Sequence, residues 1–152
     1  MDVTNLIIGR FATKIAKMAL NGEEVRIVNS QKCVITGDKK MVFAKYKRKI
    51  DMGKPEKGPF VPKQPDRLLK RMIRGMLPHK TSRGREALSR IKCFKGIPVE
   101  LNGKETISIE SASMDKSNSD KYVLLESICK HLGAKLWKIY NQAVKEKVQL
   151  RM

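Results

Sequence analysis

The residues best able to do chemistry in this sequence are basic side chains concentrated between residues 39 and 92. This stretch carries 18 Lys and Arg residues against four Asp and Glu residues, a net charge of +14. Lys and Arg bind phosphate groups through charge-assisted hydrogen bonds, and Arg can contact two oxygens at once. We call residues 39–92 the basic region, and its composition predicts a surface that binds a polyanion.

The charge of the whole chain supports the same interpretation. Its 152 residues have a formal net charge of +18, from 33 Lys and Arg against 15 Asp and Glu. Self-repulsion from such a surplus favours a polyanionic partner, with nucleic acid first and an anionic membrane surface second. The sequence contains no apolar run of about 18 residues, the length needed to span a membrane. Polar residues, Asp2 and Asn5, interrupt the first apolar stretch, so we expect neither a signal peptide nor a membrane partner.

A helix expected from about Asp66 to Leu77 has the sharpest pattern. At 100° per residue, four cations fall within about a third of its circumference: Arg67, Lys70, Arg71 and Arg74. Five apolar residues occupy the other side: Leu68, Leu69, Met72, Ile73 and Met76. A solvated basic face is the alternative, but such a face would normally carry acidic residues at i+4 spacing, and this one has none.

Two segments beside this helix are expected to lack regular structure. Residues 51–65 contain four prolines and two glycines among lysines, which predicts an extended, partly polyproline-like basic arm. A solvated linker is the alternative, but a basic segment without its own core needs a partner to become ordered. Pro78 should end the helix, and residues 79–85 should form a flexible basic turn with Gly75 and Gly84 allowing close backbone approach to a phosphate.

The remaining pattern predicts an α/β fold. Strands are expected at 5–8, 25–28, 33–36, 91–94 and 106–109, and helices at 10–20, 39–50, 122–132 and 135–149. Strand, helix and strand within some 30 residues favour a parallel crossover with helices packed on the sheet. We expect residues 1–98 to form the core, including the arm 51–65 and the basic helix and turn 66–92. Residues 99–152 should be a helical C-terminal extension of the same domain.

Catalytic and metal-binding patterns are missing. Cys33, Cys93 and Cys129 are odd in number and far apart, so we expect reduced thiols in a cytoplasmic setting. His79 and His131 have no partner at metal-ligand spacing. The sequence contains no phosphate-binding loop, nucleophile elbow or carboxylate dyad. We therefore expect no enzyme, no cofactor, no metal and no small-molecule substrate.

Aromatic residues are few, at 5% of the chain. Tyr46, Phe60 and Phe94 are the nearest candidates for stacking on a base, and each is more often a core residue. Stacking on single strands is therefore not expected to dominate. The composition favours recognition of folded RNA by its shape and backbone.

Several motifs resemble one known family. They are Gly9-Arg10-Phe11-Ala12, Val28-Asn29, Ile35-Thr36-Gly37-Asp38 and above all the eleven residues RGMLPHKTSRG at 74–84. In order along residues 5–98, the chain is similar to the universal large-subunit ribosomal protein L-thirteen family. The turn HKTSRG and the helical C-terminal part resemble the archaeal and eukaryotic branch. The absence of a long C-terminal tail favours an archaeal origin.

The resemblance implies a three-layer α/β/α fold around a small, mainly parallel sheet. It also implies a structural protein of the large subunit that binds folded rRNA, takes part in early assembly and works on cytoplasmic ribosomes. Its partners would be large-subunit rRNA and neighbouring large-subunit proteins, without stable homo-oligomers. Phe11 and Thr36 depart mildly from the family's usual leucine and serine, and residues 99–152 resemble the family only loosely.

The basic pattern and the resemblance together give a set of expected RNA contacts. They are Arg10, Lys14, Lys17, Lys45, Lys47, Arg48, Lys54, Lys57, Lys63, Arg67, Lys70, Arg71, Arg74, Gly75, His79, Lys80, Arg83, Gly84, Arg85 and Arg90.

The main alternative is a sequence-specific DNA-binding regulator. Residues 125–144 have a helix–glycine–helix pattern similar to a helix-turn-helix. The start of its second helix has lysines but no Arg or Gln suited to reading bases, and the strongest charge lies elsewhere in the chain. An α/β enzyme acting on nucleic acid ranks lower, because it would need a catalytic acid, base or metal cluster.

Overall fold

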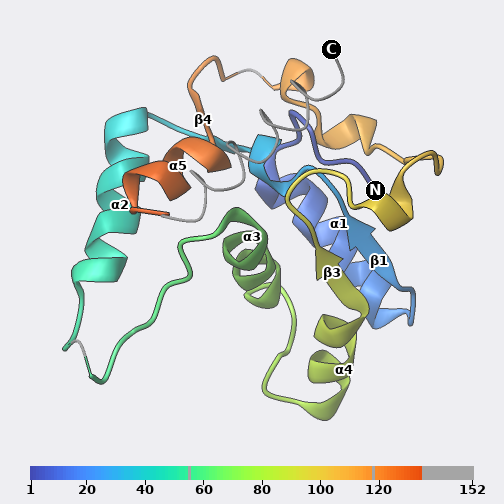
Figure 1. Ribbon diagram of the computed structural model, residues 1–152, viewed down its shortest axis with the longest axis horizontal. Helices are drawn as coiled ribbons and strands as arrows, with labels where there is room; N and C mark the ends of the chain where they lie inside the picture. Colours follow the sequence, from blue (N-terminus) through green and yellow to red (C-terminus); the bar gives the residue numbers. More distant parts are fainter. Residues whose placement is uncertain (55, 118, 135–152) are drawn as a thin grey trace, which may run out of the picture.

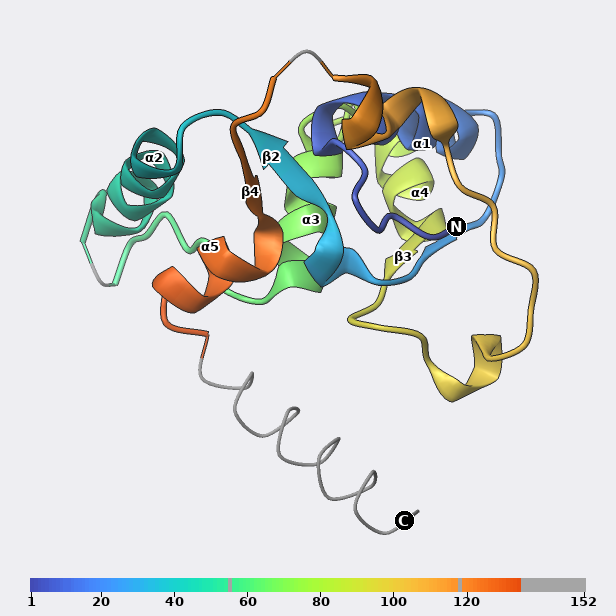
Figure 2. The ribbon, with the colours of Figure 1, turned by 90° about the horizontal axis from the view of Figure 1, so that it is seen from above.

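In the computed structural model, which describes residues 1–54, 56–117 and 119–134, five α-helices surround two short pairs of strands (Figure 1). In the first pair, β1 (Val25–Ile27) runs parallel to β3 (Ile91–Cys93). In the second pair, β2 (Val34–Thr36) runs antiparallel to β4 (Tyr122–Leu124), and the two lie side by side in Figure 2. The prediction of a small α/β fold with parallel strands is confirmed.

The N-terminal segment links the two pairs. Asp2 bridges Val28 in parallel, and Ile7 bridges Val34 in parallel. The predicted strand at 5–8 is therefore reduced to single bridges, because Asn5 adopts a left-handed φ of 57° and the next helix already begins at Ile8. A strand-like sequence this short cannot form a full ladder when its second half is taken into a helix.

The first helix, α1 (Ile8–Leu20), follows the predicted amphipathic pattern. Its buried face includes Phe11, Ile15 and Ala19, at the four-residue spacing of one helix side. The helix ends at Asn21-Gly22, and Gly22 takes a φ of 105° that disfavours other residues. Arg10, Lys14 and Lys17 are exposed on the opposite side, as predicted.

The second helix, α2 (Lys39–Asp51), buries Val42 and Tyr46 and leaves most of its cations in solvent. Asp38 occupies the expected N-cap position, although its side chain accepts no capping hydrogen bond. At the end of the molecule opposite to α1 and β1, α2 packs beside α5 (Leu125–His131) (Figure 1). The contact includes the Phe43 and His131 rings, which stack with centroids 4.6 Å apart.

Between α2 and α3 (Pro65–Arg74) the chain forms the extended arm that its prolines and glycines predict. Pro65 occupies the first turn of α3, where its missing N–H costs nothing. The arm is predicted over 51–65, but its first residue, Asp51, belongs to α2 and its last, Pro65, belongs to α3. Three core residues of α3 are buried: Leu68, Leu69 and Ile73.

The region after α3 differs from the prediction. The helix stops at Arg74, one turn before Pro78, and Met76 is 42% exposed instead of packing with the apolar side. Residues 83–85 do not belong to a flexible turn, because α4 (Ser82–Arg90) already contains them. The Thr81 hydroxyl starts this helix by accepting a hydrogen bond from the Gly84 N–H at 3.2 Å.

The segment after residue 98 also needs correction. No strand forms at 106–109, where Ile107 is 72% exposed. The helix expected from Tyr122 starts only at Leu125, because residues 122–124 pair with β2. Gly133 does terminate it, with a φ of 79°, and Ala134 N–H donates to the Cys129 carbonyl at 3.1 Å in a Schellman arrangement.

One hydrophobic core unites these elements. Leu125 and Ile128 of α5 belong to the same buried cluster as Phe11 of α1 and Leu69 of α3. The expected helix at 135–149, and with it the second half of the 125–144 motif, lies outside the described residues. Within the described ranges, no helix combines the length and the apolar character needed to cross a membrane.

Candidate nucleic-acid interface

The candidate interface consists of cations on both sides of α3. In Figure 1, α2 and the arm lie on one side of α3, and α4 and α1 lie on the other. The expected contacts are therefore spread over a broad surface of several elements. Most of their side chains are exposed, and those that are half-buried are Lys70, Arg71, His79 and Arg90.

The basic region has almost no internal charge neutralisation. Of its 18 Lys and Arg residues, only Arg90 lies within ion-pair distance of a carboxylate in the described part of the chain. That pair, with Glu86, spans 3.9 Å on the surface of α4 and is worth little. The other 17 cations are therefore not neutralised by a carboxylate of the described residues.

On α3 the predicted separation of a cationic side from an apolar side is largely observed. Arg67 and Arg74 are exposed, whereas Lys70 and Arg71 are half-buried. The Arg71 guanidinium donates a hydrogen bond to the Phe60 carbonyl of the arm. Arg71 therefore holds the arm against α3, which is a structural task that the sequence did not indicate.

Some expected contacts on α1 and α4 also have partners within the chain. Lys14 Nζ lies 2.6 Å from the Ser111 hydroxyl oxygen, and Arg90 donates to the Ala19 carbonyl at 3.3 Å. The Arg90 bond joins α4 to the end of α1. Arg10, Lys17, Arg83 and Arg85 remain exposed, so this side of α3 also presents cations.

The two glycines expected near phosphate have different surroundings. A Cβ on Gly84 would lie 2.0 Å from the Pro78 carbonyl oxygen, so this buried glycine serves close packing between the turn and α4. Its predicted role in backbone approach to a phosphate is therefore wrong, since the protein itself occupies that space. Gly75 is exposed at the end of α3 with φ −64°, and its Cβ would meet only the Met72 carbonyl at 3.3 Å.

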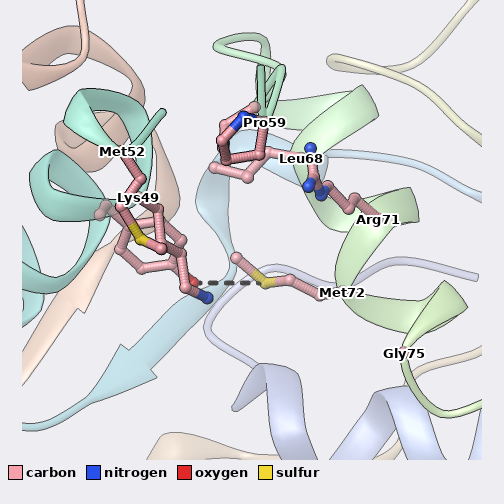
Figure 3. A pocket seen from close by; sticks show the side chains of 9 residues that line it. Lys49, Met52, Pro59, Leu68, Arg71, Met72 and Gly75 are labelled. Carbon is pink, nitrogen blue, oxygen red and sulfur yellow. Dashed lines mark hydrogen bonds between the residues drawn. The ribbon is translucent and has the colours of Figure 1, made fainter. Parts of the chain in front are cut away.

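A hollow of about 470 Å³ separates α2 from α3 (Figure 3). Lys49 of α2 and Met52 just after it line one side, Leu68 and Met72 of α3 line the other, and Pro59 approaches from the arm. Its walls are largely apolar, with a single hydrogen-bond contact across it, from the Tyr46 hydroxyl to Met72 Sδ at 3.9 Å. The hollow contains neither a carboxylate nor a histidine.

Other chemistry is not supported by the described residues. No group of three His, Cys, Asp or Glu side chains that could hold a metal occurs among them. Cys33, Cys93 and Cys129 are all free thiols. Burial raises the pKa of Cys93 and of Cys129 to about 12, and it raises the pKa of Cys33 further still. These groups are therefore neutral thiols at physiological pH and poor nucleophiles.

Comparison with known proteins decides the family. Residues 1–100 match the family described as Ribosomal protein L13. The chain belongs to this family. The L13 family consists of ribosomal structural proteins, so the chain is not an enzyme, as its sequence predicted.

Archaeal relatives in the L13 family cover nearly the whole chain. The large ribosomal subunit protein uL13 of Archaeoglobus fulgidus is 52% identical over 134 residues, which are 88% of this chain and 86% of that protein. The uL13 proteins of Methanococcoides burtonii and Haloarcula marismortui are 46% and 41% identical, over 89% and 90% of this chain and 97% and 92% of theirs. The predicted family and its archaeal branch are confirmed. An alignment of 134 residues also extends beyond residue 100, into the segment for which the motifs predict only a loose resemblance.

The predicted set omitted some exposed cations. Lys39, Lys40 and Lys49 of α2 and Lys92 of β3 are all exposed within the basic region. Lys49 Nζ lies 5.5 Å from the Tyr46 ring centroid and lines the hollow beside α3. The dense run KYKRK at 45–49 already indicates that Lys49 is exposed, because unpaired cations are almost never buried in a core.

Proposed function

We propose that this chain is a structural constituent of the large ribosomal subunit that binds folded rRNA through its phosphate backbone. The observation that carries the proposal is the basic region, where 17 of 18 cations lack a carboxylate partner in the described part of the chain. Cations without a carboxylate partner can contribute to binding free energy when they contact RNA phosphates, because the contact releases counterions condensed on the RNA. The names of the L13 relatives point to the same subunit.

The mode of binding follows from where the cations lie. They lie on α2, the arm, α3, the turn before α4, α4 and β3, so they can contact a broad, folded surface better than a single strand. Few aromatic rings are exposed among the described residues, so phosphate contacts dominate over base readout. We include in this proposal an early role in assembly, neighbouring large-subunit proteins as further partners, and a cytoplasmic location on the ribosome.

Two finer points belong to the same proposal. The RNA contacts are the predicted set, except that Gly84 acts through packing and Lys49 joins the set. Residues 1–98 and the segment that follows act as one domain, because α5 shares its core with α1 and α3.

Competition between two nucleic acids tests the proposal. The purified protein is bound to transcribed large-subunit rRNA of Archaeoglobus fulgidus and challenged with duplex DNA at matched salt. We expect a preference for the rRNA and a steep salt dependence, with roughly −0.7 to −0.9 in slope per phosphate contact. A preference for the duplex would instead support the DNA-binding alternative.

A further inference from the structure

Phe60 is the aromatic residue of the basic region that remains in solvent. Its side chain is 72% exposed, whereas Tyr46 is buried and Phe43 stacks on His131. Isolated exposed apolar residues are common on protein surfaces. The surroundings of Phe60 distinguish it from that background.

The backbone that carries the Phe60 ring is fixed from two sides. Arg71 of α3 donates a hydrogen bond to the Phe60 carbonyl. Gly58 has a φ of +77°, and a Cβ there would lie 2.9 Å from Phe60 N and 3.0 Å from Phe60 Cδ2, so the ring packs against bare glycine backbone. A ring held in one place but left exposed is preorganised for stacking, because binding costs it little further freedom.

A second hollow, of about 400 Å³, lies beside this ring between the end of α2 and the arm. Its size falls within the range of about 300–1,000 Å³ that is typical of small-ligand sites. Phe60, Met52 and Val61 supply apolar surface, and Lys54 and Lys63 supply positive charge. The Gly58 N–H donates to the Lys54 carbonyl at 2.9 Å, which closes the turn between these residues.

We infer that this second hollow binds one unpaired nucleotide of RNA, with its base against Phe60 and its phosphate at Lys54 and Lys63. The inference rests on the proposed function, because the nucleotide is part of the bound rRNA. An aromatic plane next to two cations matches the two parts of a nucleotide, a flat base and an anionic phosphate. Asp51, the one carboxylate of the lining, offers an acceptor to a ribose hydroxyl or a base amino group.

Charge favours an anionic occupant of this hollow, such as RNA. The lining carries two lysines against one aspartate within a region of net charge +14, so a basic protein segment would be repelled. The base must also be unpaired, because a duplex base is stacked on its neighbours and cannot offer its face to a protein ring. The expected ligand is therefore a bulged or loop nucleotide.

Substitution of the ring tests this site. The affinities of the wild type and of Phe60→Leu for Archaeoglobus fulgidus large-subunit rRNA are measured over a series of salt concentrations. We expect a roughly 5- to 150-fold loss of affinity at every salt concentration, the range that corresponds to the stacking of one base. The slope of affinity against salt should stay the same, because no cation is removed.

Two controls accompany this variant. Phe60→Tyr keeps the ring and should retain the wild-type affinity. Tyr122→Leu removes an aromatic side chain that is 51% exposed outside the basic region, and it should leave the affinity unchanged. Circular dichroism should show a folded protein in each case, because neither ring belongs to the core.

The outcomes of these measurements distinguish failure of the nucleotide site from failure of the proposed rRNA-binding function. Wild-type affinity in Phe60→Leu, while the wild type prefers rRNA over duplex DNA, would overturn the nucleotide site and leave the proposed function intact. Absence of that preference in the wild type would overturn both. As an independent measurement, p-benzoylphenylalanine replaces Phe60 in assembled large subunits. Photo-crosslinking to rRNA is expected, and crosslinking to a protein alone would contradict the site.

Discussion

At the scale of single residues, the interface depends on side chains that have no task inside the protein. Arg67 and Arg74 are exposed on α3 without a carboxylate partner among the described residues. Arg71, on the same helix, is different because it anchors the arm. Substitutions in this row therefore report different things, and only the first two isolate the contribution of phosphate contacts.

Combined replacement Arg67→Ala and Arg74→Ala should weaken binding to large-subunit rRNA and reduce the salt slope by about 1.4–1.8, if each residue contacts one phosphate. The free energy of unfolding should change by no more than about 0.5 kcal/mol per site, since both side chains are exposed. Lys104→Ala with Lys121→Ala removes equal charge from exposed positions outside the basic region. An equal loss of slope in that control would mean that net charge, and not position, governs binding.

Gly84→Ala should destabilise the protein, because the new Cβ would fall 2.0 Å from the Pro78 carbonyl oxygen. Overpacking of this kind typically costs about 1–3 kcal/mol, measurable by urea unfolding. Gly9→Ala is the matched control, because Gly9 also lies in a helix, α1, and a Cβ there would meet nothing within 4 Å. Gly9→Ala should be neutral or stabilising by up to about 1 kcal/mol. Equal stability of the two variants would contradict the assigned packing role of Gly84.

At the scale of elements, the arm is ordered by its contact with α3. Arg71→Ala should therefore increase backbone hydrogen exchange across residues 57–62, because the hydrogen bond to the Phe60 carbonyl is lost. Arg74→Ala removes a neighbouring cation of α3 without touching the arm and serves as control. Unchanged exchange in Arg71→Ala would show that the prolines alone hold the arm in place.

Elements with a clear local signal could be predicted from sequence. The apolar spacing of α1, the cations of α3 and Gly133 after α5 all behave as their patterns indicate. The strand at 122–124 could not be predicted, because its pairing with β2 is a contact over almost 90 residues that overrides local preference. The early start of α4 was missed because a basic, glycine-containing turn hid the Thr81 cap.

The location of the candidate interface could be predicted from sequence, because it depends on charge alone. A count of cations locates the basic region without any structure. It cannot reveal that Arg71 holds Phe60, or that Phe60 is exposed while Tyr46 is buried, since these depend on how the arm folds back on α3. The packing of Gly84 cannot be predicted for the same reason, because only the folded turn shows what lies against it.

At the scale of the whole molecule, the core is continuous from α1 to α5 and encloses two thiols. Burial raises the pKa of Cys129 to about 12 and raises that of Cys33 even more, so both stay protonated at pH 8. Because the thiolate is the reactive form, alkylation of both by iodoacetamide at pH 8 should require unfolding. Mass spectrometry after a urea series should show modification rising with the unfolding transition. Rapid labelling of the native protein would indicate a core less closed than described.

The charge distribution of the whole molecule can be tested directly by lysine modification in the complex. Acetylation rates are compared for the free protein and for its complex with large-subunit rRNA, by mass spectrometry. We expect strong protection in the basic region, at Lys45, Lys47, Lys54, Lys57, Lys63 and Lys80, and little at Lys104 and Lys121, although all eight are exposed in the free protein. Uniform protection, or protection confined to Lys104 and Lys121, would contradict the claim that the basic region binds the RNA backbone.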